Sequence, residues 1–323
     1  MSGRVKRAVT HLLRRARRFD PRETLLLVAD ARGGSTWTAQ ALKLLPGTYY
    51  NPEPLHLSYT PELARVGFGW RQHIAQRDEW PAVRGILVDG VLTGRRPNYA
   101  QAWQNSYRAL ATGRQLLVKL VRGKLLLPWL IDELAPRHPP VVLVRHPLAM
   151  ISSMRRSALF DYPFEPVDLA PLDRGSGVYS RHAALFASLT TIYEQQVAYW
   201  AVANAYLLRH PYNGRRFHVY SYEELLRDPL ATLGRMAAQW QRDLPASVES
   251  HIARPSHTSD RGAIDPVRQL GAWRSELPPD LQRRYAEIFA AVGVDFYSAD
   301  SDLPTVDLAT LGGSPDAAKS TGA

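Results

Sequence analysis

Five short apolar runs, most of them followed by a turn and a helix, constrain the fold of this chain more than any other feature. Each run has the length of a strand buried on both faces, and together they cover residues 24–29, 48–51, 115–120, 140–144 and 217–221. Helices are predicted over residues 37–45, 147–154 and 181–209, and from residue 223 onward. This alternation favours an α/β fold of three layers, in which a central parallel sheet is flanked by helices. In such sheets, ligands bind at the carboxyl ends of the strands.

The domain organisation follows from where the regular pattern begins and ends. One domain over residues 23–300 accounts for all the predicted strands and helices. Within it, residues 56–83 are rich in Trp, His and Tyr, which predicts a helical and aromatic cap rather than a core layer. Residues 301–323 are small and polar and are expected to form a disordered tail. No apolar run reaches the roughly 18 residues of a membrane span.

The positive charge of the chain is concentrated in one segment. The net charge is +10, and residues 1–22 contain eight basic residues and one acidic residue, so this segment carries +7 and the remainder only +3. A nearly neutral body argues against nucleic acid as a partner. The segment is expected to be a solvated basic helix, with weak contact to an acidic membrane surface as the alternative. It lacks the apolar stretch of a secretion signal, and the chain has no cysteine, which together favour the cytoplasm.

A glycine-containing turn follows the first predicted strand and precedes a helix. Its sequence is Arg32-Gly33-Gly34-Ser35-Thr36. Two glycines let the backbone wrap around an oxyanion, the helix start supplies free N–H groups, and the arginine and hydroxyls add further donors. The turn is not a Walker A loop, because no Gly-Lys pair precedes the hydroxyl residues. It is either a phosphate-binding turn or a tight strand-to-helix connection.

A second candidate anion site follows the fourth predicted strand, at Arg145-His146-Pro147, and continues into a helix that carries Ser153. An arginine at a strand end can bind a phosphate through its guanidinium fork, or it can pair with a carboxylate. Two such sites on neighbouring strands would suit a ligand with two separated phosphates.

Together these segments resemble the sulfotransferases that use 3′-phosphoadenylyl sulfate (PAPS). The DARGGSTW segment is similar to the family's 5′-phosphosulfate loop, and VLVRHPLAMISS is similar to its 3′-phosphate motif. The resemblance implies a P-loop-like fold, no metal, and 3′,5′-ADP as the product. Arg32 stands where other members of the family have lysine, which resembles the carbohydrate sulfotransferases. The lack of a membrane anchor and of cysteine is expected of a bacterial member. By this resemblance the donor would contact Arg32, Gly33, Gly34, Ser35, Thr36, Trp37, Arg145, Ser153 and Tyr222, with Trp37 and Tyr222 on the adenine side.

A catalytic base is expected beside the phosphate-binding turn. Glu53 ends the second predicted strand and resembles the glutamate of the Glu-Pro-Leu segment in carbohydrate sulfotransferases. Burial would raise its pKa toward neutrality, although the same residue could simply pair with Arg32. His56 is the competing base, and Lys119 is either a donor to the sulfuryl oxygens or a strand-end charge.

The predicted function is transfer of a sulfuryl group from PAPS to a hydroxyl of a glycan, glycolipid or other metabolite. The alternative is a nucleotide-binding protein with a P-loop-like turn, either without catalytic activity or acting like a kinase. The missing Gly-Lys pair argues against the kinase alternative.

Overall fold

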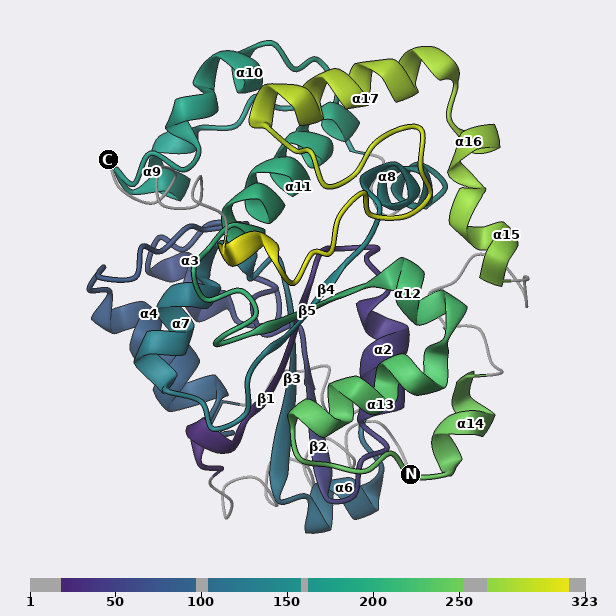
Figure 1. Ribbon diagram of the computed structural model, residues 1–323. Coiled ribbons are helices and arrows are strands. Elements are labelled where there is room, and N and C mark those ends of the chain that lie inside the picture. Colours follow the sequence, from purple (N-terminus) through teal and green to yellow (C-terminus); the bar gives the residue numbers. More distant parts are fainter. Residues whose placement is uncertain (1–18, 97–103, 158–161, 253–265, 314–323) are drawn as a thin grey trace.

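Five parallel strands form the centre of the computed structural model, which describes residues 19–96, 104–157, 162–252 and 266–313 (Figure 1). The strands are β1 (Leu25–Ala29), β2 (Thr48–Pro52), β3 (Gln115–Val121), β4 (Val141–Val144) and β5 (His218–Ser221). They lie in the order β2-β3-β1-β4-β5. The prediction of an α/β fold with a central parallel sheet flanked by helices is therefore confirmed.

Successive side chains of a strand point to opposite sides of the sheet, so strands that are apolar along their whole length make both faces apolar. On one face Leu25 and Leu27 of β1 join a cluster that includes the helices α2 (Ser35–Leu42) and α13 (Pro229–Gln239). On the other face Leu26 and Val28 join a larger cluster that includes α7 (Leu127–Leu134), α8 (Pro147–Arg155) and α11 (Ile192–Leu208). Figure 1 shows α2 and α13 on the opposite side of the sheet from α7.

The remaining helices are short, apart from one near the C-terminus. They are η1 (Pro21–Glu23), α3 (Pro61–Arg65), α4 (Pro81–Ile86), η2 (Leu87–Val91), α6 (Tyr107–Thr112), η3 (Lys124–Leu126), α9 (Leu169–Asp173), η5 (Ser180–His182), α10 (Ala183–Ala187), α12 (Tyr222–Arg227), α14 (Ser247–Ile252), α15 (Pro266–Gly271), α16 (Trp273–Glu276), α17 (Pro279–Val292) and η6 (Leu311–Gly313).

The strand order places a topological switch point beside β1. The chain goes to one side of β1 for β2 and β3, and to the other side for β4 and β5. Leu27 is paired with Lys119 of β3 on one side and with Val141 of β4 on the other. In open parallel sheets the crevice at the carboxyl ends beside such a point is where ligands bind.

The predicted cap contributes to the core as well as to the surface. Between residues 56 and 83, Leu63, Phe68 and Ile74 are buried in the larger apolar cluster, while the Trp70 side chain stays 40% exposed. The segment is therefore not separate from the core. Its short helices α3 and α4 each have Pro near the first position, where a missing N–H is tolerated.

Two predictions about extended segments are wrong. Residues 181–209 do not form one helix, because Thr191 and Glu194 make a reciprocal capping box that starts α11 anew at Ile192. Residues 301–313 are not a disordered tail: Leu308 is buried, and its carbonyl accepts a 2.7 Å hydrogen bond from Asn213 Nδ2. Residues 314–323 lie outside the described part of the chain.

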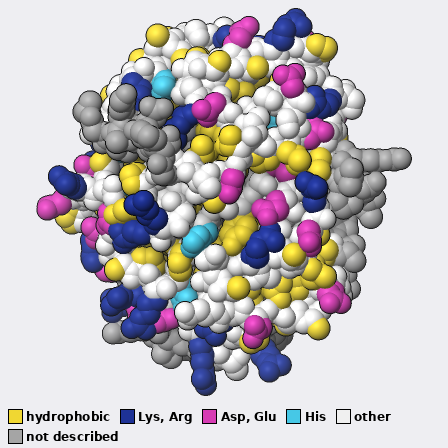
Figure 2. Space-filling model, in the orientation of Figure 1, with side chains coloured by type: hydrophobic (Ala, Val, Ile, Leu, Met, Phe, Trp, Pro, Cys, Tyr) yellow, Lys and Arg dark blue, Asp and Glu magenta, His cyan; other side chains and the backbone are white. Residues whose placement is uncertain are grey.

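Charged side chains of both signs are interspersed on the face shown in Figure 2, with apolar groups between them. Residues 1–18, most of the predicted basic segment, lie outside the described residues, so its predicted membrane contact is not addressed by the structure. Among the helices of the described residues, none has the length and hydropathy needed to span a membrane.

Candidate functional site

The turn between β1 and α2 needs glycine at two positions. Gly33 donates its N–H to Asp30 O at 3.1 Å, and a Cβ on Gly33 would lie only 2.9 Å from that oxygen. Gly34 has a φ of 86°, in the left-handed region, and a Cβ there would lie 2.2 Å from Cε2 of Tyr222. Arg32 is also left-handed, with a φ of 61°. The predicted phosphate-binding turn is thus a tightly wound segment that leads directly into α2.

The acidic residue of this turn is already paired. Lys124 Nζ lies 2.6 Å from Asp30 Oδ2 and 2.6 Å from Asn204 Oδ1, and Asn204 Nδ2 donates to Asp30 Oδ2 at 3.2 Å. All three side chains are buried. Burial lowers the pKa of Lys124, and the Asp30 carboxylate opposes that shift. The network anchors the end of β1 to α11, and the Asp30–Lys124 ion pair carries no net charge.

The two predicted anion sites meet at the carboxyl ends of β1 and β4. Arg145 donates from Nη1 to Arg32 O at 2.8 Å, and Arg32 donates from Nε to Ser153 Oγ at 3.0 Å. The Arg145 guanidinium lies 4.7 Å above the ring centre of Tyr222, and the same ring packs against Gly34. Arg32 therefore bridges the two segments, and Arg145 holds the shape of the first turn while remaining close to it.

Buried polar groups fix the turn between β4 and α8. Glu223 accepts from the N–H of His146 at 2.8 Å and from the Tyr297 hydroxyl at 2.8 Å. The His146 ring accepts from the N–H of Leu148 at 3.2 Å through Nδ1, and its Nε2 lies 3.0 Å from Ser298 O. Burial lowers the pKa of His146 to about 4. The ring is therefore neutral at pH 7 and caps α8, which has Pro147 at its start.

Glu53 and Lys119 form an ion pair that reaches the first turn. Glu53 follows β2 directly, has a φ of 46°, and donates its N–H to Lys119 O at 2.9 Å. Lys119 Nζ lies 2.7 Å from Glu53 Oε1 and donates to Thr36 Oγ1 at 3.0 Å. Lys119 is 3% exposed and lies within β3, so it is not the strand-end residue that the sequence suggested.

The expected upward shift of the Glu53 pKa is wrong. Burial does raise the pKa of this carboxyl, but the Lys119 ammonium lowers it by charge and by hydrogen bonding, and Arg122 and His56 lower it further. The net pKa lies below its ordinary value. Glu53 is thus an ionised carboxylate at neutral pH, held beside a buried ammonium.

The competing base, His56, closes the turn that starts at Glu53. Its N–H donates to Glu53 O at 2.9 Å, and its ring lies between Tyr59, with ring centres 4.4 Å apart, and Trp70, at 4.9 Å. Burial and the nearby Arg122 lower the pKa of His56. Its Nδ1 is buried and has no hydrogen-bond partner among the described residues.

Trp37 lies on α2 and is half-buried, with its ring centre 6.2 Å from that of His251. Tyr222 is buried beneath the first turn, with 8% of its surface exposed. Ser35 is buried at the first position of α2. All the residues predicted to bind the donor therefore lie on or directly beside the two turns. The described residues contain no group of three or more His, Cys, Asp or Glu side chains that could hold a metal ion.

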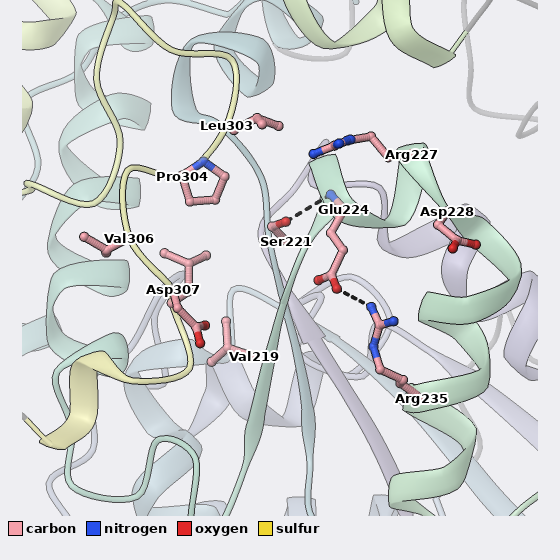
Figure 3. A pocket seen from close by; sticks show the side chains of 11 residues that line it. Val219, Ser221, Glu224, Arg227, Asp228, Arg235, Leu303, Pro304, Val306 and Asp307 are labelled. Carbon is pink, nitrogen blue, oxygen red and sulfur yellow. Dashed lines mark hydrogen bonds and ion pairs between the residues drawn. The ribbon is translucent and has the colours of Figure 1, made fainter.

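Two cavities lie in the described part of the structure, and only one of them is lined by a residue predicted to belong to the site. One of about 520 Å³ is lined by His56 and Trp70 and by two arginines, Arg71 and Arg122. The other, of about 690 Å³, lies between β5, α12, α13 and residues 303–308, and none of the predicted site residues lines it (Figure 3).

Arg122, Arg71 and the Asp30–Lys124–Asn204 network are not among the residues predicted from the sequence. Arg122 directly follows β3, so the rule that ligands meet parallel strands at their carboxyl ends could have singled it out. No comparable signal marks Arg71 or Asn204, whose positions depend on contacts between segments far apart in the chain.

Comparisons with known proteins find similar solved structures only. No protein-family model matches, and no curated protein matches either. The sulfotransferase domain from the curacin biosynthetic pathway is 15% identical, over 83% of this chain and 97% of that chain, with a TM-score of 0.41. The sulfotransferase domain of the Synechococcus PCC 7002 olefin synthase is 19% identical, over 85% and 95%, with a TM-score of 0.45. Mouse sulfotransferase SULT7A1, complexed with PAP, is 14% identical, over 88% of each chain, with a TM-score of 0.41. Similarity at this distance does not carry an activity or residue roles to this chain.

Proposed function

We propose that this protein is a sulfotransferase that moves the sulfuryl group of PAPS to a hydroxyl of a glycan, glycolipid or other metabolite. The observation that carries the proposal is the junction of the two turns, where Arg145 bonds to Arg32 O and Arg32 bonds to Ser153. A donor with phosphate groups at both its 3′ and its 5′ position needs two anion sites a short distance apart. Two arginines and two helix starts on adjacent strands supply them.

The residues of the first turn fit a phosphosulfate. Gly33 and Gly34 let the backbone take this tightly wound course, because a side chain at either position would collide with Asp30 O or Tyr222. The turn leads into the start of α2, where free N–H groups can bind an oxyanion. Thr36 and Lys119 add a hydroxyl and an ammonium at the same place. These groups would stabilise charge that develops on the transferring and leaving oxygens.

The reaction requires a proton acceptor as well as charge stabilisation. The acceptor oxygen forms a bond to sulfur, the bond from sulfur to the 5′-phosphate oxygen breaks, and the hydroxyl proton leaves. The products are a sulfate ester and 3′,5′-ADP. We assign the proton to Glu53, because this carboxylate is ionised and shares Lys119 with the first turn. His56 is neutral and lies next to it, which makes it the second candidate.

Nucleotide affinities test the donor assignment. Calorimetry should show that 3′,5′-ADP binds at least about tenfold more tightly than 5′-AMP or ATP, since a charged hydrogen-bonded pair contributes about 1.5–3 kcal/mol. Arg145→Ala should remove this preference, and Arg145→Lys should restore part of it, because the charge returns without the fork. Arg283→Ala, at an exposed position on α17, is the control. Binding of ATP as tight as that of 3′,5′-ADP would overturn the proposal.

Turnover of PAPS tests the base. Glu53→Gln keeps a hydrogen-bonding partner for Lys119 but cannot accept a proton at neutral pH. We expect the rate of 3′,5′-ADP release to fall about 10²–10⁴-fold while the affinity for 3′,5′-ADP changes little. His56→Gln should have a smaller effect. The opposite ranking of the two variants would assign the proton to His56 instead.

A further inference from the structure

The cavity of about 520 Å³ beside His56 has walls that are aromatic and basic. Trp70, Tyr162 and Tyr199 provide aromatic faces, and Arg71 and Arg122 provide the charge. His56 forms part of the wall nearest Glu53, because its backbone N–H bonds to Glu53 O. The volume is in the range of sites that enclose a small molecule.

The two arginines are held against aromatic rings rather than against carboxylates. The Arg122 guanidinium lies 4.5 Å from the ring centre of Trp70, and that of Arg71 lies 4.6 Å from the ring centre of Tyr199. Arg71 also donates to Oε1 of Gln196. Within the described part of the chain, neither guanidinium forms an ion pair with an acidic side chain.

Two of the three acidic groups near this charge are each paired with a lysine. Glu53 and Asp30 both act on Arg122 electrostatically, but Glu53 is paired with Lys119 and Asp30 with Lys124. Asp168 lines the cavity too, and its carboxylate caps α9 by accepting from the N–H of Ala170 at 3.1 Å. Burial and the like charge of Arg71 lower the pKa of Arg122 to about 10. With two arginines against the single Asp168 carboxylate in its wall, the cavity has an excess of positive charge at neutral pH.

The backbone supports a functional reading of both arginines. Arg71 has a φ of 62° and Arg122 a φ of 68°, both in the left-handed region, which is unfavourable for any residue other than glycine. Arg122 is fixed there by its N–H, which donates to Ala29 O at 3.2 Å. Non-glycine residues kept in this conformation tend to be found at binding and catalytic sites.

We propose that this cavity binds the acceptor, and that the acceptor carries an oxyanion, a carboxylate or a phosphate, in addition to the hydroxyl that is sulfated. This inference rests on the proposed sulfotransferase function. The guanidinium forks of Arg71 and Arg122 bind the oxyanion, the aromatic faces pack against the carbon skeleton, and the hydroxyl lies at the His56 end, toward Glu53.

The test compares acceptors that differ only in charge. A panel of aromatic and aliphatic hydroxy acids is measured beside the methyl ester of each acid and the corresponding phosphonate. Binding is measured by calorimetry with 3′,5′-ADP present, and turnover by release of 3′,5′-ADP from PAPS. We expect the best acids or phosphonates to bind about 10–100-fold more tightly than their esters. A preference for acids or for phosphonates distinguishes the two oxyanions.

Variants locate the preference. Arg122→Gln and Arg71→Gln should each reduce it about tenfold or more, while their affinity for 3′,5′-ADP, which also reports correct folding, stays close to that of the unaltered protein. Arg283→Gln, at an exposed position on α17, should change neither quantity. Esters that bind as tightly as the acids would overturn the inference. An equal loss of 3′,5′-ADP affinity in the Arg122 and Arg71 variants would also overturn it, because these residues would then belong to the donor site.

The two proposals fail separately. Tight 3′,5′-ADP binding without any preference for anionic acceptors refutes the acceptor class and leaves the donor assignment intact. If the protein does not bind 3′,5′-ADP but prefers anions in a way that depends on Arg71 and Arg122, the proposed sulfotransferase function is refuted. The proposal that this cavity binds anions then still holds.

Discussion

Gly34 is the position where a single methyl group should be most damaging to the first turn. A Cβ at this residue would lie 2.2 Å from Tyr222 Cε2 and 2.3 Å from Cδ2, and the ring is buried, with 8% of its surface exposed. The φ of 86° adds a second cost. We expect about 1–2 kcal/mol from the left-handed conformation and about 1–3 kcal/mol from overpacking against the ring. Gly34→Ala should therefore lower the free energy of unfolding by about 2–5 kcal/mol.

Gly67 offers a matched control for the steric part of this cost. Its φ is 81°, close to that of Gly34, but a Cβ there would have no neighbour within 4 Å. Gly67→Ala should cost only the conformational part, about 1–2 kcal/mol. Equilibrium urea unfolding, followed by tryptophan fluorescence, measures both variants. If Gly34→Ala and Gly67→Ala cost the same, the packing of Tyr222 under the turn is not what requires glycine at position 34.

Three further predictions concern buried charge, pH and backbone strain. Lys124→Met leaves the buried Asp30 carboxylate without its charged partner, with the Asn204 amide still bonded to it, and should cost about 3–5 kcal/mol of stability. Lys43→Met should cost about 1 kcal/mol or less, and urea unfolding measures both variants. Burial lowers the pKa of His73 to about 4, so the unfolded chain takes up a proton there that the folded chain does not. Stability should then fall as the pH drops from 6.5 to 4, and His73→Leu should reduce that slope by up to about 1.4 kcal/mol per pH unit; an unchanged slope would contradict the shift. Arg122→Gly should be more stable than Arg122→Ala by about 1–2 kcal/mol, because glycine accepts a φ of 68° without strain; equal stabilities would show that this conformation is not strained.

The strands could be predicted to within one or two residues, because buried parallel strands are continuous apolar runs that end at turn-forming residues. The run at residues 24–29 became β1, Leu25–Ala29, and the run at 140–144 became β4, Val141–Val144. The prediction of one long helix over residues 181–209 was wrong because it overlooked a helix start inside the segment. Thr191 and Glu194 have the spacing of a capping box, a signal that was present in the sequence and that outweighed the apolar pattern around it.

The positions of the two turns could be predicted from local sequence, but the contacts that distant segments make around them could not. A turn with two glycines after a strand indicates an anion site by its own chemistry. The link from Arg32 to Ser153 spans 121 positions, and nothing local to either residue specifies it. The direction of the Glu53 pKa shift was wrong for the same reason: burial was foreseen, but the ammonium of Lys119 on the neighbouring strand was not.

Residues with a left-handed backbone occur both in the turn after β1 and in the wall of the cavity of about 520 Å³. Of the seven non-glycine residues with positive φ in the described part of the chain, four are Arg32, Glu53, Arg71 and Arg122. Arg32 lies in the turn after β1, Glu53 follows β2, and Arg122 follows β3, so each of three adjacent strands is followed within three residues by a residue in this unfavourable conformation. Each such residue costs about 1–2 kcal/mol relative to a right-handed one. A sequence selected for stability alone would have glycine there, but glycine could not supply the guanidinium or the carboxylate. The cost is therefore best explained by the side chains themselves, three of which follow the carboxyl ends of neighbouring strands.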